Sequence, residues 1–200
     1  MMTVMKDVVA SSTTIRVAVA SAALALMTAL PIYAQKSFDY RVLATSKTST
    51  LEKEMNEAAE AGFRFSFVMG GDTAVGGSEG VAVLTKTGQG GRYAYKLLAT
   101  SKTSTMQKEL QEASDGGFEY RDQTVFKSTF GGQEVVCILE RDKDAAAEKY
   151  EYKLLATTKT STLEKELREA GTAGYEVMGM TVSKTALGGK ELVAITRRAK

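Results

Sequence analysis

A polar run of threonine, serine and lysine occurs three times in this chain and offers its clearest potential for chemistry. It reads Thr-Ser-Lys-Thr-Ser-Thr at residues 45–50, and it recurs at 100–105 and, with one serine replaced by threonine, at 157–162. Each run stands where a helix is expected to begin, and helix N-termini attract anions through free N–H groups and the helix dipole. One hypothesis is therefore a small-anion or small-ligand site built from Lys47, Ser49, Lys102, Ser104, Lys159 and Ser161.

Helix capping is the competing explanation of the same residues. A capping box pairs an N-cap serine with a glutamate or glutamine three residues later. The chain has that spacing three times, in the pairs Ser49/Glu52, Ser104/Gln107 and Ser161/Glu164. Such a cap stabilises a helix by about 1 kcal/mol. The glycines of a phosphate-binding P-loop are missing from the runs. Capping beside a solvated lysine is thus the favoured interpretation, and anion binding is the alternative.

The composition gives little support to catalysis. The chain has no histidine, which removes the commonest general base and metal ligand and every Ser-His or Cys-His nucleophilic arrangement. The single cysteine, Cys137, stands between Val136 and Ile138, which predicts a buried structural thiol. Acidic residues do not show the spacing of a calcium loop. We therefore expect a non-enzymatic protein without a metal or cofactor.

The elements that position these residues belong to an internal repeat. Residues 38–86, 93–141 and 150–198 align without a gap, and the second and third repeats share more than half of their residues. A fixed period of this kind indicates stacked copies of one supersecondary unit. We expect three domains with these boundaries, joined by short linkers.

Each repeat predicts a strand, a helix and two further strands. In the third repeat, apolar residues alternate along 150–157, and a 3.6-residue apolar period follows to Gly171. Gly174 is expected to end the helix in a left-handed conformation, as are Gly62 and Gly117. A second strand runs to about Lys184, a glycine pair predicts a hairpin, and a third strand covers 191–196.

The third strand is apolar on both faces, which places it in the centre of its sheet. The expected fold is α+β, with three tandem βαββ repeats, each a three-stranded antiparallel sheet with one helix packed on it. Because a unit of this size is marginally stable alone, the second sheet face should pack against a neighbouring repeat. In the first repeat, Gly70-Gly71-Asp72 predicts a shorter second strand.

The third repeat resembles a family of short bacterial βαββ domains of unknown function. The likeness rests on Leu163-Glu164-Lys165-Glu166-Leu167, on Ala170-Gly171 and on Gly174-Tyr175-Glu176-Val177. Those domains share a tyrosine-rich first strand, a Leu-Glu-x-x-Leu helix and a Gly-aromatic-Glu restart. This chain has Phe or Tyr where tryptophan is frequent, and its first two repeats lack the glycine at the position of Gly171. The resemblance implies the fold and no activity.

The N-terminal segment is typical of a secretory signal peptide. Lys6 and Arg16 precede an apolar run from Val17 to Leu30, Pro31 ends the run, and Ile32-Tyr33-Ala34 offers a cleavage site. We predict a signal peptide at 1–34, an exported periplasmic or extracellular protein, and no stable membrane span after cleavage. Retention of the segment as an anchor is the alternative.

The remaining chain is nearly neutral, because the full sequence carries +2 and loses two basic residues and one acidic residue with the segment. This charge gives no reason to expect a nucleic-acid partner. The favoured function is binding or structural contact in the cell envelope, with an unknown envelope protein or small ligand as the partner and self-association as a further expectation.

Overall fold

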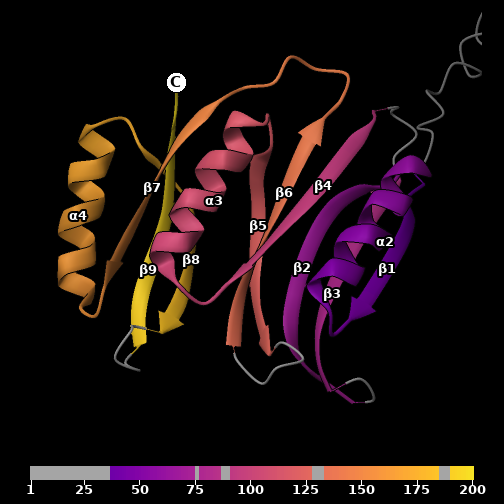
Figure 1. Cartoon of the computed structure of the whole chain (residues 1–200), viewed down its shortest axis with the longest axis horizontal. Helices are drawn as coiled ribbons and strands as arrows, with labels where there is room; N and C mark the ends of the chain where they lie inside the picture. The colour runs from indigo at the N-terminus through magenta and orange to yellow at the C-terminus, as the bar shows by residue number, and fades with distance from the viewer. Residues whose placement is uncertain (1–36, 75–76, 87–90, 128–132, 185–189) are drawn as a thin grey trace, which may run out of the picture. The chain divides into compact units, whose positions relative to one another are not determined.

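A computed structural model describes residues 37–74, 77–86, 91–127, 133–184 and 190–200 (Figure 1). Phe38–Lys200 forms one compact unit. The predicted signal peptide at 1–34 and the hairpin glycines at 131–132 and 188–189 lie outside the described residues. No described helix is long and apolar enough to cross a membrane.

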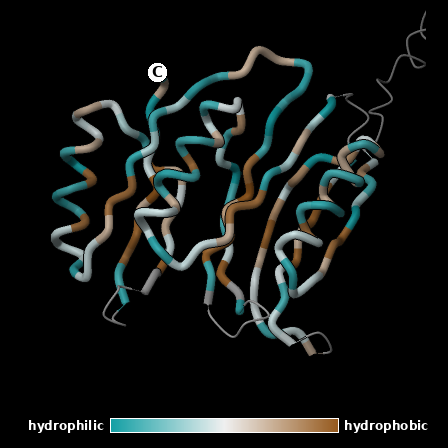
Figure 2. The backbone as a smooth tube through the Cα atoms, in the orientation of Figure 1, coloured by the Kyte–Doolittle hydropathy of each residue, from teal (hydrophilic) through white to brown (hydrophobic). Residues whose placement is uncertain are grey.

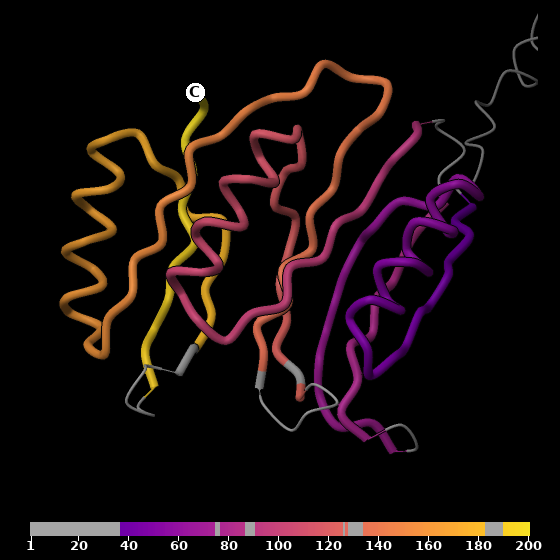
Figure 3. Tube along the Cα trace, in the orientation of Figure 1, coloured from indigo at the N-terminus to yellow at the C-terminus, as the bar shows by residue number. Residues whose placement is uncertain are grey.

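Each repeat has the predicted βαββ order (Figure 3). The elements of the first repeat are β1 (Asp39–Thr45), α2 (Thr48–Glu60), β2 (Arg64–Thr73) and β3 (Gly77–Lys86). The second repeat consists of β4 (Tyr93–Thr100), α3 (Thr103–Asp115), β5 (Glu119–Lys127) and β6 (Gln133–Asp142). The third repeat consists of β7 (Tyr150–Thr157), α4 (Thr160–Thr172), β8 (Glu176–Lys184) and β9 (Lys190–Ala199).

The third strand of each repeat lies in the centre of its sheet, as predicted. The strand orders are β1-β3-β2, β4-β6-β5 and β7-β9-β8, and all pairings are antiparallel. The register is the same in each, since Tyr40, Tyr95 and Tyr152 oppose equivalent residues of the central strands. The three sheets can therefore be compared position by position.

The helix ends confirm one prediction and correct another. Gly62, Gly117 and Gly174 have φ of 87°, 83° and 83°, the left-handed conformation expected just beyond a helix C-terminus. The capping boxes are wrong, because the N-cap positions are Lys47, Lys102 and Lys159, and none of the three helices has a side-chain cap hydrogen bond. The cap serines instead lie inside the first turn.

The prediction of a shortened second strand in the first repeat is also wrong. Strand β2 has 10 residues, while β5 and β8 have 9 each. Gly70 is retained within β2 because the neighbouring repeat comes very close: a Cβ atom there would lie 2.5 Å from the main-chain oxygen of Val125. A glycine that weakens strand propensity here permits the approach of two sheets.

The apolar cores are shared between neighbouring repeats. One cluster joins Leu51 and Met55 of α2 to Leu97 and Ile138 of the second repeat, and a second cluster joins α3 to tyrosines and Ile195 of the third. Figure 2 shows hydrophobic residues concentrated along the strands. Each of α2 and α3 contacts its own sheet and the first strand of the next repeat. The second sheet face of the second and third repeats therefore packs against a neighbouring repeat, as predicted.

Candidate functional site

The residues proposed for anion binding lie on the surface. Lys47, Ser49, Lys102, Ser104, Lys159 and Ser161 are all exposed at the helix starts. Among the described contacts, no side chain of this set bonds to a residue of another repeat. Anion binding at these helix starts stays a prediction.

The glutamate and glutamine of the presumed capping boxes serve the next repeat instead. Glu52 accepts a hydrogen bond from the main-chain N–H of Leu97 at 2.7 Å. One helical turn later, the Asn56 side chain accepts from the N–H of Tyr95 and donates to its carbonyl oxygen, both at 2.9 Å. Strand β4 lies at the edge of its sheet, so the main-chain groups on its outer side do not pair with β6. Side chains of α2 bond to these groups instead.

The same docking holds between the second and third repeats. Gln107 accepts from the N–H of Leu154 at 3.1 Å, and Gln111 accepts from the N–H of Tyr152 at 3.1 Å and donates to the oxygen of Tyr150 at 3.0 Å. Ser114 adds two bonds to the main chain of Tyr150. Two polar side chains spaced by four residues on one helix thus hold the free edge of the following strand.

A tyrosine on that strand completes each interface. Tyr95 is 3% exposed, and its hydroxyl accepts from the N–H of Phe65 at 2.7 Å. Tyr152, at the equivalent position, accepts from the N–H of Tyr120 at 2.9 Å. Both N–H groups stand at a β-bulge in the second strand of the preceding repeat, where the ladder is interrupted. The bulge therefore presents a donor that the next repeat satisfies.

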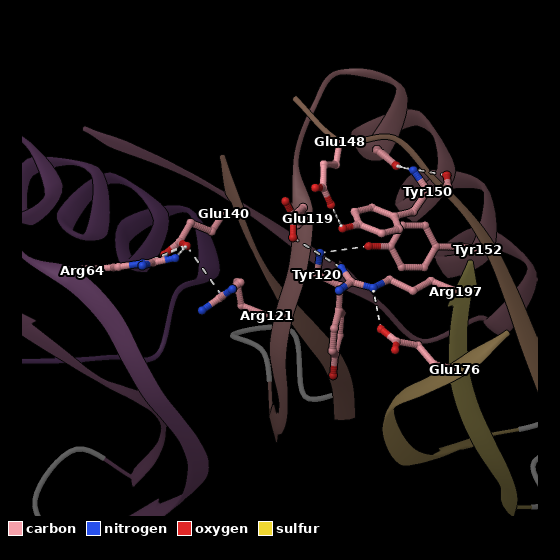
Figure 4. A network of polar contacts seen from close by, with 11 residues as sticks. Arg64, Glu119, Tyr120, Arg121, Glu140, Glu148, Tyr150, Tyr152, Glu176 and Arg197 are labelled. Carbon is pink, nitrogen blue, oxygen red and sulfur yellow. Dashed lines mark hydrogen bonds and ion pairs between the residues drawn. The ribbon is translucent and has the colours of Figure 1, made fainter. Parts of the chain in front are cut away.

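Ion pairs of opposite orientation distinguish the two interfaces (Figure 4). Arg64 of the first repeat lies 2.8 Å from Glu140 of the second, which is 4% exposed and also accepts from the Tyr95 hydroxyl at 2.9 Å. At the equivalent positions of the next interface, Glu119 lies 3.5 Å from Arg197. Because the signs are exchanged, pairing the first repeat with the third in this way would bring Arg64 against Arg197.

Burial at the interfaces raises the pKa of the tyrosines. The pKa of Tyr95 lies above its ordinary value because burial disfavours the phenolate and Glu140 adds negative charge nearby. Burial likewise raises the pKa of Tyr120 and Tyr152. All three hydroxyls therefore stay protonated at neutral pH. Cys137 is fully buried, as predicted, and burial raises its pKa to about 12, which makes it a poor nucleophile.

The first repeat has an open copy of the sheet face that is covered in the other two repeats. Val42, Val83 and Phe67 are cross-strand neighbours and share one face of the sheet. At the equivalent positions of the second repeat, Leu97 and Ile138 are buried beneath α2. We call the exposed set of the first repeat the head face; it consists of Phe38, Tyr40, Val42, Phe67 and Met69.

The third repeat has the complementary open surface. Helix α4 contacts β7, β8 and β9 of its own sheet, and Leu163, Leu167 and Leu192 help to line an open hollow of about 570 Å³ on it. Glu164 and Arg168, at the positions of the docking side chains, bond to each other at 2.6 Å. We call the exposed set the tail face; it consists of Glu164, Arg168, Val177, Met180 and Val182.

Together these two faces contain every large apolar side chain that is exposed within the described ranges. No group of His, Cys, Asp or Glu residues in those ranges could hold a metal ion. The sequence analysis missed both faces. One signal was available in the first repeat, where Phe67 and Met69 replace the Asp122 and Thr124 of the second.

Comparison with family models, with curated proteins and with solved structures gives no match to this chain. The likeness to short bacterial βαββ domains stays a prediction of relationship.

Proposed function

We propose that this chain is an exported, non-enzymatic repeat protein of the cell envelope that acts by binding or structural contact through its head face. The observation that supports this is the position of the exposed apolar residues. Phe67 is 71% exposed and Tyr40 is 61% exposed, although the equivalent sheet faces of the other repeats are buried between repeats. Export is inferred from the signal-like segment at 1–34.

The head face combines two properties of a binding surface. It offers contiguous apolar side chains, which soluble proteins rarely leave open without a role. It also borders a strand edge, because β1 pairs with β3 alone among the described strands and has the register of β4 and β7. By that register, the main-chain groups of Tyr40 and Val42 lie where helix side chains bond in the other repeats. A partner gains apolar burial and directed hydrogen bonds from the same surface.

Site-directed photocrosslinking in intact cells tests this function. A benzoylphenylalanine in place of Tyr40 should give a discrete adduct in the envelope fraction, because the ring lies on the head face. The matched control replaces Lys53, which is 77% exposed on the outer side of α2 and pairs with Glu57. Absence of an adduct from position 40, or an equal pattern from position 53, would contradict binding through the head face.

A further inference from the structure

We infer that the occupant of the head face is the tail face of a second molecule of this chain, joined head to tail. This inference rests on the proposed function, since it names the partner of the same surface. The argument is that the chain already forms this contact twice within itself, between α2 and β4 and between α3 and β7. Helix α4 and strand β1 are the two members of the series left without their counterparts among the described residues.

The helix side of the contact is largely retained in α4. Leu163 and Leu167 occupy the positions of Met106 and Leu110, which are fully buried in α3. Glu164 stands at the position of Glu52 and has a free carboxylate oxygen for the N–H of Val42 in the second molecule. Glu164 would then accept from Val42 as Glu52 accepts from the N–H of Leu97.

The second strand of the third repeat also keeps its half of the contact. Val177 occupies the position of Phe65 and Tyr120 in the repeat, and both of these stand at a β-bulge. Strand β8 has the same bulge, between Val177 and Gly179. In the two internal interfaces the N–H at this position donates to a tyrosine hydroxyl of the next repeat. Tyr40 supplies the equivalent hydroxyl on the head face of the second molecule.

The charges at the contact permit the pairing. Glu176 stands at the position of Arg64 and Glu119, and its counterpart in the second molecule is Thr85, at the position of Glu140 and Arg197. A carboxylate facing a threonine hydroxyl accepts a hydrogen bond and meets no like charge. Arg168 is the weaker element, because it donates to the strand edge but cannot accept from the N–H of Tyr40 as Asn56 and Gln111 do for their strands.

Such a contact is heterologous, so it generates rings or open chains of molecules. It lacks the covalent linker that raises the effective concentration of neighbouring repeats within one chain. We therefore expect association that depends on protein concentration, in place of a fixed dimer.

The test uses two variants that each disable one face. Val42→Lys places a charge on the head face, and Val177→Lys places one on the tail face; both residues are at least half exposed, so the fold should tolerate the change. Glu57→Lys, on the outer side of α2, is the control. Mass is measured by sedimentation over about a hundredfold range of concentration, because self-association is driven by mass action.

The parent and Glu57→Lys should both grow in mass with concentration, and each face variant should stay at the mass of one chain. An equimolar mixture of Val42→Lys and Val177→Lys should then give a heterodimer, because one intact tail remains for one intact head. A parent that is monomeric throughout, variants that still assemble, or a mixture that stays monomeric would each overturn the head-to-tail contact.

The crosslinking experiment separates this inference from the function on which it rests. An adduct of the chain with itself from position 40 supports both. An adduct with another protein, with a monomeric parent, keeps the function and overturns self-assembly. A crosslink from position 40 to residues 1–37 of the same chain identifies the N-terminal segment as the occupant and also overturns it.

Discussion

Helices α3 and α4 have the same length of 13 residues and share 8 of them, but they differ in what covers them. Helix α3 lies against its own sheet and against β7, and it buries Met106, Leu110, Ala113 and Ser114. Helix α4 lies against one sheet and buries only Leu163 and Ala170. The difference shows that burial of these helices depends on a following strand more than on their own apolar period.

The polar residues of the two helices differ at the positions that dock. Gln107 and Gln111 of α3 bond to the main chain of β7, whereas Glu164 and Arg168 of α4 bond to each other on the surface. An amide can both donate and accept, which suits the alternating groups of a strand edge. An oppositely charged pair in water contributes little to stability. Helix α4 therefore lacks the amide pair with which α3 holds the edge of the strand beyond it.

Equivalent leucines give the largest expected difference between the helices. Leu110→Ala should lower the free energy of unfolding by about 3–4 kcal/mol, since it opens a cavity between two layers. Leu167→Ala should cost about 1 kcal/mol, because the side chain is only half-buried. Urea denaturation of both variants at a concentration where the chain is monomeric measures the difference. Equal losses would mean that β7 does not cover α3 as described.

Exchanging the docking residue gives the next largest effect. Gln111→Arg gives α3 the residue of α4 and removes the acceptor for the partly buried N–H of Tyr152. Leaving such a donor unpaired costs about 1–3 kcal/mol. The free energy of unfolding from denaturant titration measures the loss, and a loss below about 0.5 kcal/mol, the usual range for surface substitutions, would contradict a role of Gln111 in docking.

The reverse change is the matched control. Arg168→Gln alters only an exposed pair with Glu164, so the free energy of unfolding should stay within about 0.5 kcal/mol of the parent. The same variant supplies the missing acceptor at the tail face. It should therefore strengthen head-to-tail association, which sedimentation would detect as growth in mass at lower protein concentration.

The repeats and the strand order could be predicted from the sequence because they depend on local patterns. The apolar run from Val135 to Leu139 indicated a central strand, and Gly62 and its equivalents marked the helix ends. The capping boxes failed because each acidic or amide side chain has another partner: Glu52 and Gln107 bond to the next repeat, and Glu164 bonds to Arg168 of its own helix. Gly70 led to the wrong prediction of a short second strand because its close neighbour, Val125, belongs to another sheet.

The two open faces could not be located without the packing between repeats. Tyr40 and Tyr152 occupy the same place in the repeat, but only the structure shows that one is 61% exposed and the other 4%. Two differences between repeats were nevertheless visible in the sequence: the amides of α2 and α3 give way to Arg168, and Phe67 and Met69 stand where later repeats have smaller or polar residues. Both mark positions at which the environment changes.

Alkaline titration tests the covered side of α3. Burial holds the pKa of Tyr152 above its ordinary value, so the unfolded chain loses this proton first as pH rises. Below about pH 10, Tyr152 makes its full contribution to the free energy of unfolding. Above that pH the contribution falls by up to about 1.4 kcal/mol per pH unit, until the pKa of Tyr152 in the folded state is reached. Above pH 10, the free energy of unfolding of Tyr152→Phe should therefore fall less steeply with pH than that of the parent, and the two slopes should differ by up to that amount. Identical slopes in urea titrations at pH 10 and above would contradict burial of this hydroxyl.

The smallest expected effect concerns the helix starts, where α3 and α4 again differ. Thr103 at the start of α3 donates to the carboxylate of Glu191 at 2.6 Å, so a negative charge already lies beside that N-terminus and disfavours an anion there. Replacing Lys47, Lys102 and Lys159 with glutamine should change the free energy of unfolding by no more than about 0.5 kcal/mol, because all three are exposed. The variant should also respond to phosphate and sulfate as the parent does in thermal unfolding. If phosphate or sulfate stabilises the parent but not the triple variant, binding at the helix starts is supported. Restoring Lys102 alone should then recover less of the stabilisation by the anion than restoring Lys159 alone. The reason is that, in the described residues, only the α3 start has a carboxylate bonded beside it.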